Sequence, residues 1–445
     1  AMGCVLSAPV ELIRVQRHGS KQFRCAVAEM QGWRPSHEDA HAMRASESFG
    51  SFWVLDGHGG DGAALFGAPA LSKEFQGLEN GALATDSRIE EGFASVDSKL
   101  RAHFSEHPDQ DSGSTVVGLL VHVQGDGTYS AKLLNCGDSR GVVVRGPDVT
   151  EGAATDTPVR IPEHLRILRE AANAAGGEAA ERNKADDPLA IQWPIMAESI
   201  DHKPNHPTEK ARIESAGGHV SEEEPPRLDG NLAVSRGLGD FEYKQGSDIP
   251  VSEQKVSVVP DVYEVTGLSA GTICILACDG IWDVMSGQFV ANHIRDQLQR
   301  DPALDLGEIA VELVRMSLRK NSRDNVTLMI VQFCDGSDWA SVPDEMKGYD
   351  KLVSPPEDSF DDDVRKQYMS FLQRTNFIAE PRPCNICMKW YAEMNQCPCK
   401  TVDYCSRACQ KKGWKAHKVN CTSAINTNSD SPQNKKDRKS TEVTK

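Results

Sequence analysis

Four short acidic motifs, far apart in the chain, each lie beside an apolar run that has the length of a β-strand. Strand ends can gather carboxylates that are hundreds of residues apart into one cleft. Crowded carboxylates repel one another and take up protons unless cations intervene, and their hard oxygen atoms suit Mg²⁺ or Mn²⁺ better than zinc. The pattern is therefore typical of a metal-dependent phosphoryl-transfer site. The motifs are Arg34-Pro-Ser-His-Glu38-Asp39, Asp56-Gly-His58-Gly-Gly60, Asp279-Gly280 and Arg323-Asp324-Asn325.

Further motifs occur between these four. They are Ser112-Gly-Ser-Thr115, Asn135-Cys-Gly-Asp138-Ser-Arg140, Asp201-His-Lys-Pro204, Asn231-Leu-Ala-Val-Ser-Arg236 with Gly239-Asp240, and Leu276-Ala-Cys-Asp279-Gly-Ile-Trp-Asp283. In this order they resemble the metal-dependent serine/threonine protein phosphatases of the protein phosphatase 2C (PP2C, PPM) family, from about Phe23 to Phe333. A single glycine-rich acidic motif is weak evidence, but many in the right order are specific.

The resemblance implies an α+β fold, a four-layer α/β/β/α sandwich of two antiparallel sheets flanked by helices, with metals at one end. The sequence itself shows only many short strand-like runs and a few longer helical ones. The implied activity is hydrolysis of phosphoserine and phosphothreonine in phosphoprotein substrates.

Two Mg²⁺ or Mn²⁺ ions follow from the resemblance. It implies that Asp56, Asp279 and Asp324 bind one ion directly. Asp56 and the Gly57 carbonyl would bind the second, with Glu38 acting through water. A water held between two such ions loses a proton near neutral pH and can attack phosphorus in line.

Three more residues of these motifs have expected roles. Asp39 would support the water network around the metals. Arg34 matches the phosphate-binding arginine of the family, and a planar guanidinium can hold two phosphate oxygens at once; the alternative is an arginine paired with a surface acid. His58 would be the general acid, because an imidazole can hold a proton near neutral pH and release it.

Two features of the catalytic region leave alternatives open. Asp138, with Asp279 and Asp283, resembles a third, weaker metal site, although a turn aspartate that bonds its own backbone is a common alternative. The segment from Gly217 to Asn231 takes the place of the family's flap, and would affect substrate choice or be solvated surface.

A second module has the ligand spacing of zinc sites. Eight soft ligands in some forty residues would hold two structural zinc ions, because so short a segment cannot otherwise bury a sufficient core. With Tyr404 and Trp414 the spacing resembles the MYND finger, which implies interleaved binding and a proline-rich peptide or protein partner. Cys397 and Cys399 depart from the family by having one residue between them. The implied sets are Cys384, Cys387, Cys405 and Cys409 for one ion, and Cys397, Cys399, His417 and Cys421 for the other.

Charge is distributed unevenly along the chain. The net charge is −16 over 445 residues. Residues 381–421 contribute +6 and the tail from 422 contributes +2, so the rest carries −24. An acidic body attracts divalent cations and repels nucleic acid, or serves solubility. The basic finger could bind a partner or the acidic body, and no base-stacking motif supports nucleic-acid binding.

The expected organisation has five parts. The parts are an N-terminal lead-in (1–20), a phosphatase domain (21–334, with an insertion at 145–197), an acidic linker (335–379) with a short helix at 364–373, the finger (380–421) and a disordered tail (422–445). The insertion is expected on a surface loop, contains a helical stretch from about Pro162 to Asn183, and has either a regulatory role or none.

The cysteines and the N-terminus bear on localisation. Because the finger holds most cysteines, and Cys136 lies in an apolar strand-like run, the chain is predicted to be cytoplasmic and reduced. No apolar stretch approaches the ~20 residues that span a bilayer. Met2-Gly3-Cys4 fits the pattern for acylation at Gly3 and Cys4, which would anchor the protein to a membrane if Ala1 is an added residue. The alternatives are an unmodified N-terminus and, for the whole protein, an inactive scaffold that acts through its finger.

Overall fold

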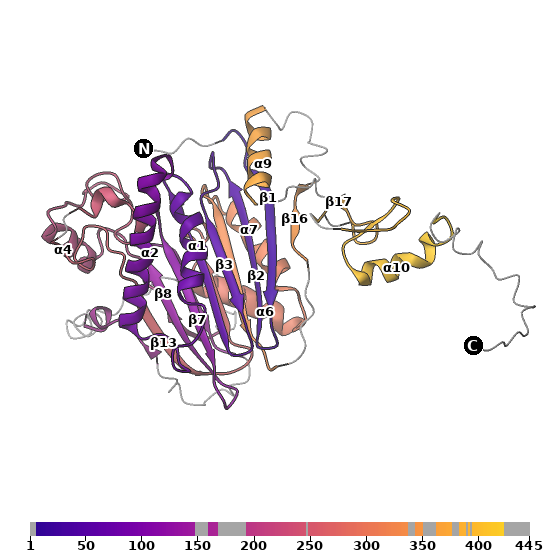
Figure 1. The fold of residues 1–445 in the computed structure, drawn as a ribbon, viewed down its shortest axis with the longest axis horizontal. Coiled ribbons are helices and arrows are strands. Elements are labelled where there is room, and N and C mark those ends of the chain that lie inside the picture. Colours follow the sequence, from indigo (N-terminus) through magenta and orange to yellow (C-terminus); the bar gives the residue numbers. More distant parts are fainter. Residues whose placement is uncertain are drawn as a thin grey trace, which may run out of the picture.

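Two antiparallel sheets form the body of the protein (Figure 1). The computed structural model describes residues 6–146, 159–167, 193–245, 248–336, 343–349, 362–375, 382–388, 390–391 and 394–421. The seven-stranded sheet has the order β11 (Ile195–Glu198), β9 (Arg140–Val144), β14 (Ile273–Ala277), β15 (Val326–Phe333), β2 (Phe23–Gly32), β1 (Val10–Gly19) and β16 (Glu345–Lys347). The six-stranded sheet has the order β10 (Val159–Arg160), β13 (Asp261–Leu268), β8 (Tyr129–Cys136), β7 (Val116–Val123), β4 (Phe49–Leu55) and β3 (Ala40–Ala45).

The central strands are apolar on both faces because each face is covered. In β2, Ala26 and Ala28 belong to the core under the helices, whereas Cys25 and Val27 belong to the core between the sheets. Successive side chains of a strand point to opposite faces, so one apolar run serves two cores. These strands therefore form continuous apolar runs in the sequence.

Helices cover the outer face of each sheet. Helices α1 (Gly62–Glu74) and α2 (Asp86–Glu106) pack on the six-stranded sheet, and α6 (Gly287–Arg300) and α7 (Leu306–Arg319) pack on the seven-stranded sheet. Thr85 caps α2 by accepting a hydrogen bond from the Arg88 amide, which satisfies one free N–H of the first turn. The expected four-layer α/β/β/α sandwich is confirmed.

A smaller sheet and a flap complete the catalytic end. The small sheet pairs β12 (Leu238–Gly239), β6 (Gly113–Ser114) and β5 (Gly57–His58). Helix α4 (Pro207–Ser215) directly precedes the flap expected at 217–231, and its Ile213 is buried with Leu228 of the flap and with Val256 in a separate core. Short helices η1 (Pro108–Gln110), η2 (Phe241–Tyr243) and α5 (Asp279–Trp282) lie between the larger elements.

Two expected boundaries are wrong. Most of the lead-in 1–20 is strand β1, which pairs with β2 from Val10 to Gly19. The linker 335–379 contains β16, which pairs with β1, and α9 (Asp362–Arg374), which covers the expected helix at 364–373. Both segments are ordered because they share an apolar core, and burial of its side chains offsets the conformational entropy that the segments lose. Its fully buried members are Val10, Leu12, Met346, Val364, Tyr368 and Phe371.

The insertion also differs from a plain loop at its ends. Val159–Arg160 is the edge strand β10 of one sheet, and Ile195–Glu198 is the edge strand β11 of the other. Most of the helical stretch expected at 162–183 lies outside the described residues, as do Gly3, Cys4 and the tail 422–445.

The finger is a small separate unit (Figure 1). It contains β17 (Arg382–Pro383), β18 (Trp390–Tyr391), β19 (Asn395–Gln396), β20 (Asp403–Tyr404) and α10 (Arg407–His417). Within the residues that the structure describes, no helix has the length and apolar character needed to cross a membrane.

Candidate metal centre and active site

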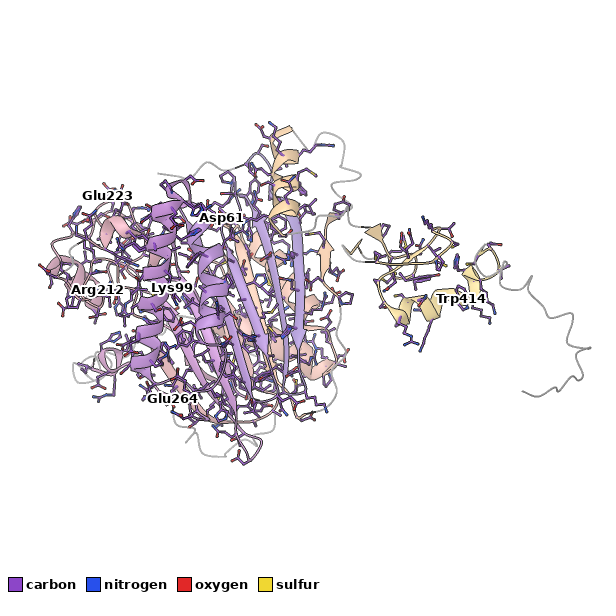
Figure 2. All side chains as sticks on the ribbon, in the orientation of Figure 1. Asp61, Lys99, Arg212, Glu223, Glu264 and Trp414 are labelled. Carbon is purple, nitrogen blue, oxygen red and sulfur yellow. The ribbon has the colours of Figure 1, made fainter. Side chains whose placement is uncertain are left out.

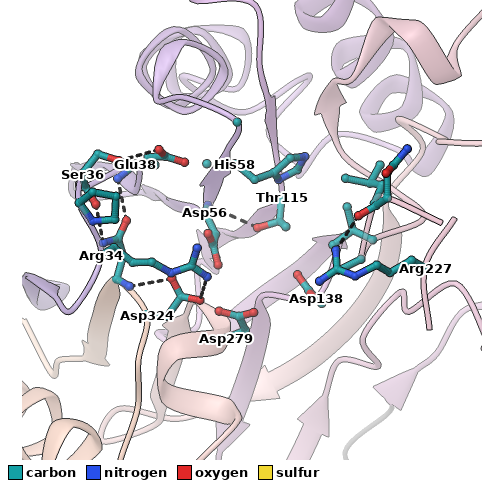
Figure 3. A pocket seen from close by; sticks show the side chains of 18 residues that line it. Arg34, Ser36, Glu38, Asp56, His58, Thr115, Asp138, Arg227, Asp279 and Asp324 are labelled. Carbon is teal, nitrogen blue, oxygen red and sulfur yellow. Dashed lines mark hydrogen bonds and ion pairs between the residues drawn. The ribbon is translucent and has the colours of Figure 1, made fainter. Parts of the chain in front are cut away.

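Strand register brings the acidic motifs to one end of the two sheets. Asp39 directly precedes Ala40, which pairs with Leu55, and Asp56 directly follows Leu55. In the other sheet β14 pairs with β15, so Asp279 and Asp324 lie beyond the same end of that pair. A cleft of about 440 Å³ is lined by Glu38, Asp56, Asp138, Asp279 and Asp324, whose carboxylates lie close together (Figure 3), whereas Asp39 is buried behind it.

Asp56 is held through its backbone, which leaves its carboxylate free for a ligand. Its carbonyl accepts hydrogen bonds from the Thr115 amide (2.9 Å) and the Ser114 hydroxyl (3.1 Å). At Gly57 a Cβ atom would lie 2.4 Å from the Glu38 carbonyl oxygen, so only glycine allows the two motifs to approach this closely.

The carboxylates of the cleft destabilise one another. Burial raises the pKa of Asp56 well above its usual range, and the charges of Asp279, Asp39 and Asp324 raise it further. Burial also raises the pKa of Asp279, with added repulsion from Asp138. Such a cluster remains ionised at neutral pH only with cations among its members.

The donor set fits hard divalent cations. One carboxylate oxygen of Asp39 accepts a hydrogen bond from the Thr327 hydroxyl (2.6 Å), whereas the other is buried and has no hydrogen-bond partner among the described residues. Cys278 lies within 4.8 Å of the Asp39 and Asp56 ligand atoms. Burial raises the pKa of the Cys278 thiol well above its usual range, so it remains neutral beside an oxygen-ligand site.

Arg34 lies at the mouth of the cleft. Its guanidinium forms an ion pair with Asp324, and its side chain is 44% exposed. Figure 3 shows it extending over Asp324 toward the other carboxylates. A guanidinium in this place can reach both the cleft and a phosphate group that enters from solvent.

Glu38 is positioned by Asn325, the residue directly before β15. Its amide donates to the Asn325 side-chain oxygen (2.7 Å), while the Asn325 amide group donates to the carbonyls of Gln31 and Ser36. The Glu38 carboxylate accepts from the Ser36 hydroxyl (2.7 Å). Asn325 thus fixes the loop that carries three of the expected site residues.

His58 has a carboxylate partner. Its Nε2 lies 2.8 Å from an Asp240 carboxylate oxygen, across Gly113 of the small sheet. Burial lowers the pKa of His58, but the charge and hydrogen bond of Asp240 outweigh this effect and raise it above the usual value. A protonated imidazole at the edge of the cleft can serve as a general acid.

The three residues of the expected third metal site interact electrostatically. Asp283 is exposed; partial desolvation raises its pKa, and the charge of Asp138 raises it further. The charges of Asp138 and Asp283 also raise the pKa of Asp279. The Lys203 ammonium group forms an ion pair with Asp138. A cation of the chain itself thus partly neutralises this group of acids.

The finger brings its eight expected ligands into the two sets of four that the resemblance implied. Within one set, the sulfur atoms of Cys387 and Cys405 are 3.7 Å apart. In the other, Cys397 and Cys421 are 3.6 Å apart, and the Cys399 sulfur is 3.2 Å from His417 Nε2. A tetrahedron with Zn–S bonds of ~2.3 Å has edges of ~3.8 Å. Both sets fit zinc, and the short Cys397-to-Cys399 spacing is accommodated.

Comparisons with known proteins agree with this geometry. A family model for protein phosphatase 2C matches residues 23–178 and 194–326. The chain belongs to the protein phosphatase 2C family. A MYND finger model matches residues 384–421. As a protein phosphatase 2C with a MYND finger, the chain is a serine/threonine protein phosphatase.

Two relatives and one solved structure illustrate the similarity. Protein phosphatase 1A of Bos taurus is 30% identical over 382 residues, which cover 82% of this chain and 85% of the relative. Protein phosphatase 1A of Homo sapiens is 32% identical over 348 residues, covering 75% and 76%. The crystal structure of a phosphatase from Toxoplasma gondii is 25% identical with a TM-score of 0.56, and covers 76% of this chain and 99% of that one.

Several residues of this phosphatase site had no role assigned from sequence. Lys203 and Asp240 stand within matched motifs, so the motifs were the available signal, but their contacts with Asp138 and His58 required the structure. Arg227 lines the cleft from the flap, and only its place in the expected flap pointed to it.

Proposed function

We propose that this phosphatase hydrolyses phosphoserine and phosphothreonine with two divalent cations at the acidic cleft. The observation that carries the proposal is the half-buried Asp56, whose carboxylate is repelled by the charges of Asp279, Asp39 and Asp324. Asp56, Asp279 and Asp324 would hold one ion. Asp56, the Gly57 carbonyl and, through water, Glu38 would hold the second, with a third at Asp138, Asp279 and Asp283.

Bound there, Mg²⁺ or Mn²⁺ would lower the pKa of nearby water toward neutrality and offset phosphate charge. The protein residues have separate tasks. Arg34, with 44% of its side chain exposed, would hold the phosphate oxygens. His58 would protonate the departing serine or threonine oxygen, with Asp240 keeping the imidazole protonated and oriented.

Asp56→Asn tests this proposal. Substrates are p-nitrophenyl phosphate and a phosphothreonine peptide, each with Mn²⁺. Losing the central carboxylate is expected to lower kcat by at least ~100-fold. Asp109→Asn is the matched control, because Asp109 is exposed in η1, and it should retain wild-type activity. Equal rates in wild-type and Asp56→Asn proteins would contradict the proposal and favour the inactive scaffold.

The finger would recruit a proline-rich peptide or protein to the phosphatase. Its surface exposes Met388 (67%), Trp414 (40%) and Val419 (69%), which can contact the apolar rings of such a peptide. Figure 2 shows Trp414 on α10. We also propose that the protein acts in the cytoplasm and that acylation at Gly3 and Cys4 anchors it to a membrane.

A further inference from the structure

Helix α9 packs against the catalytic loop, the loop of residues 33–39 that carries Arg34 and Glu38, although the two are far apart in the sequence. It follows residue 326, where the family match ends, and precedes the first finger cysteine, Cys384. Its last residue, Arg374, contacts two of the loops that carry the expected ligands. The helix is thus an element outside the matched family ranges with a direct connection to the metal centre.

Arg374 makes two directional hydrogen bonds. Its Nη2 donates to the Asp39 carbonyl oxygen (2.7 Å), and its Nε donates to an Asp61 carboxylate oxygen (3.0 Å). The Arg374 side chain is only 15% exposed, whereas the Asp61 side chain is 42% exposed, so the contact with Asp61 is partly open to water. A guanidinium has a fixed, planar set of donors, and therefore sets the distance between its two partners.

The two partners belong to different ligand loops. Asp39 ends the loop that carries Arg34 and Glu38. Asp61 is the N-cap residue of α1 (Figure 2), directly after the motif of Asp56. The pairing of β3 with β4 joins these two loops at their strand ends, and the Gly60 amide donates a long hydrogen bond to the Glu38 carboxylate (3.4 Å). Arg374 adds a further link between the loops from helix α9.

Helix α9 is itself firmly anchored. The Phe371 ring packs edge-on against His37 of the catalytic loop, with ring centroids 5.2 Å apart. The Tyr368 hydroxyl accepts a hydrogen bond from the Glu11 amide (3.1 Å), and Gln31 donates to Gln367 (3.3 Å). Because the helix is fixed along its length, its terminal arginine has a defined position.

We propose that Arg374 is a positioning residue of the metal centre, which holds the two ligand loops in register through Asp39 and Asp61. The inference rests on the proposed function, because the loops are argued to carry metal ligands. Loss of Arg374 would let the loops separate and would weaken cation binding. It would leave the ligands themselves in place.

The test compares three full-length variants by calorimetric titration with Mn²⁺ and by the Mn²⁺ dependence of kcat. Arg374→Met removes both hydrogen bonds, and its Mn²⁺ affinity is expected to fall by ~10-fold or more, as for other residues that orient metal ligands. At saturating Mn²⁺ its kcat should recover to within about threefold of the wild type. Arg374→Lys keeps the charge but not the planar donors, and should be intermediate.

Arg365→Met is the matched control, since Arg365 lies on the exposed face of the same helix. It should bind Mn²⁺ like the wild type. If Arg374→Met fails to fold, Asp61→Ala tests the same clamp from the other side, with a weaker effect, because it removes the acceptor of the Arg374 Nε hydrogen bond. Wild-type Mn²⁺ affinity in Arg374→Met, or in a folded Asp61→Ala, overturns the inference alone. If the wild-type protein does not bind Mn²⁺, both this inference and the proposed function are wrong.

Discussion

At the scale of single residues, His58 and Asp240 are the pair whose chemistry depends most on geometry. Asp240 raises the pKa of His58 although burial acts in the opposite direction. A general acid works only while protonated, so kcat should fall as pH rises through the His58 pKa. The 2.8 Å contact with Asp240 moves that fall to higher pH.

Asp240→Asn is therefore expected to shift the alkaline fall of kcat to lower pH for a phosphothreonine peptide. It should leave the reaction of p-nitrophenyl phosphate nearly unchanged, because p-nitrophenolate departs without protonation. His58→Gln should lower the peptide rate by about 10². The measurement is kcat against pH for both substrates. An identical shift with both substrates would show that Asp240 does not act through a general acid.

At the scale of elements, helix α4, which precedes the flap, is joined to β13 by a buried ionic network. Glu209 of α4 accepts hydrogen bonds from Arg212 (2.7 Å), Ser235 (2.7 Å) and Arg236, and Arg236 also donates to Asp261 of β13 (2.9 Å). Burial raises the pKa of Glu209, but the charge and hydrogen bond of Arg236 together with the charges of His202 and Arg212 outweigh this effect and hold the pKa far below its usual range.

This lowered pKa predicts an acid-labile contribution to stability. It is fully present above the unfolded value of ~4.3 and is lost as pH falls below it. Glu209→Gln should lower the free energy of unfolding by about 3 kcal/mol at pH 7, because it leaves Arg236 poorly paired. The difference from the wild type should shrink between pH 5 and 3, as urea unfolding can measure. A difference that stayed constant with pH would contradict the assignment.

The elements at the edges of the fold show where sequence patterns fail. Strand β1 was placed outside the domain and β16 within a linker, although both pair in the seven-stranded sheet. An edge strand is stabilised by pairing with a segment that can lie far away in the sequence. The residue pattern of the edge strand alone therefore does not show that it is paired and buried. Central strands such as β2 and β15 are recognisable because both faces are apolar.

At the scale of the whole molecule, the acidic catalytic body and the finger should be stabilised by different ions. Wild-type protein is expected to hold two zinc ions in the finger, and Cys399→Ala to hold one, as native mass spectrometry can count. Cys334→Ala is the control, because Cys334 lies outside the finger and should leave both ions bound.

The same variants separate recruitment from catalysis. Structural zinc supplies about 10 to 16 kcal/mol in such fingers, so Cys399→Ala should also lose binding of a proline-rich peptide. Its hydrolysis of p-nitrophenyl phosphate should persist, because the body has its own cores. Two zinc ions in Cys399→Ala would contradict the proposed ligand set.

The sequence by itself determined the family, and through that resemblance the layered fold, the acidic site residues and the two zinc ligand sets. The motifs that identify the family are carried by side-chain type and local spacing, because a metal ligand must recur at a defined position. The tertiary structure decided which other groups surround those residues. The contacts of Asp240 with His58, Lys203 with Asp138, and Arg374 with Asp39 join segments 65 or more residues apart. Such pairs form only when packing brings their elements together, and no local pattern records them.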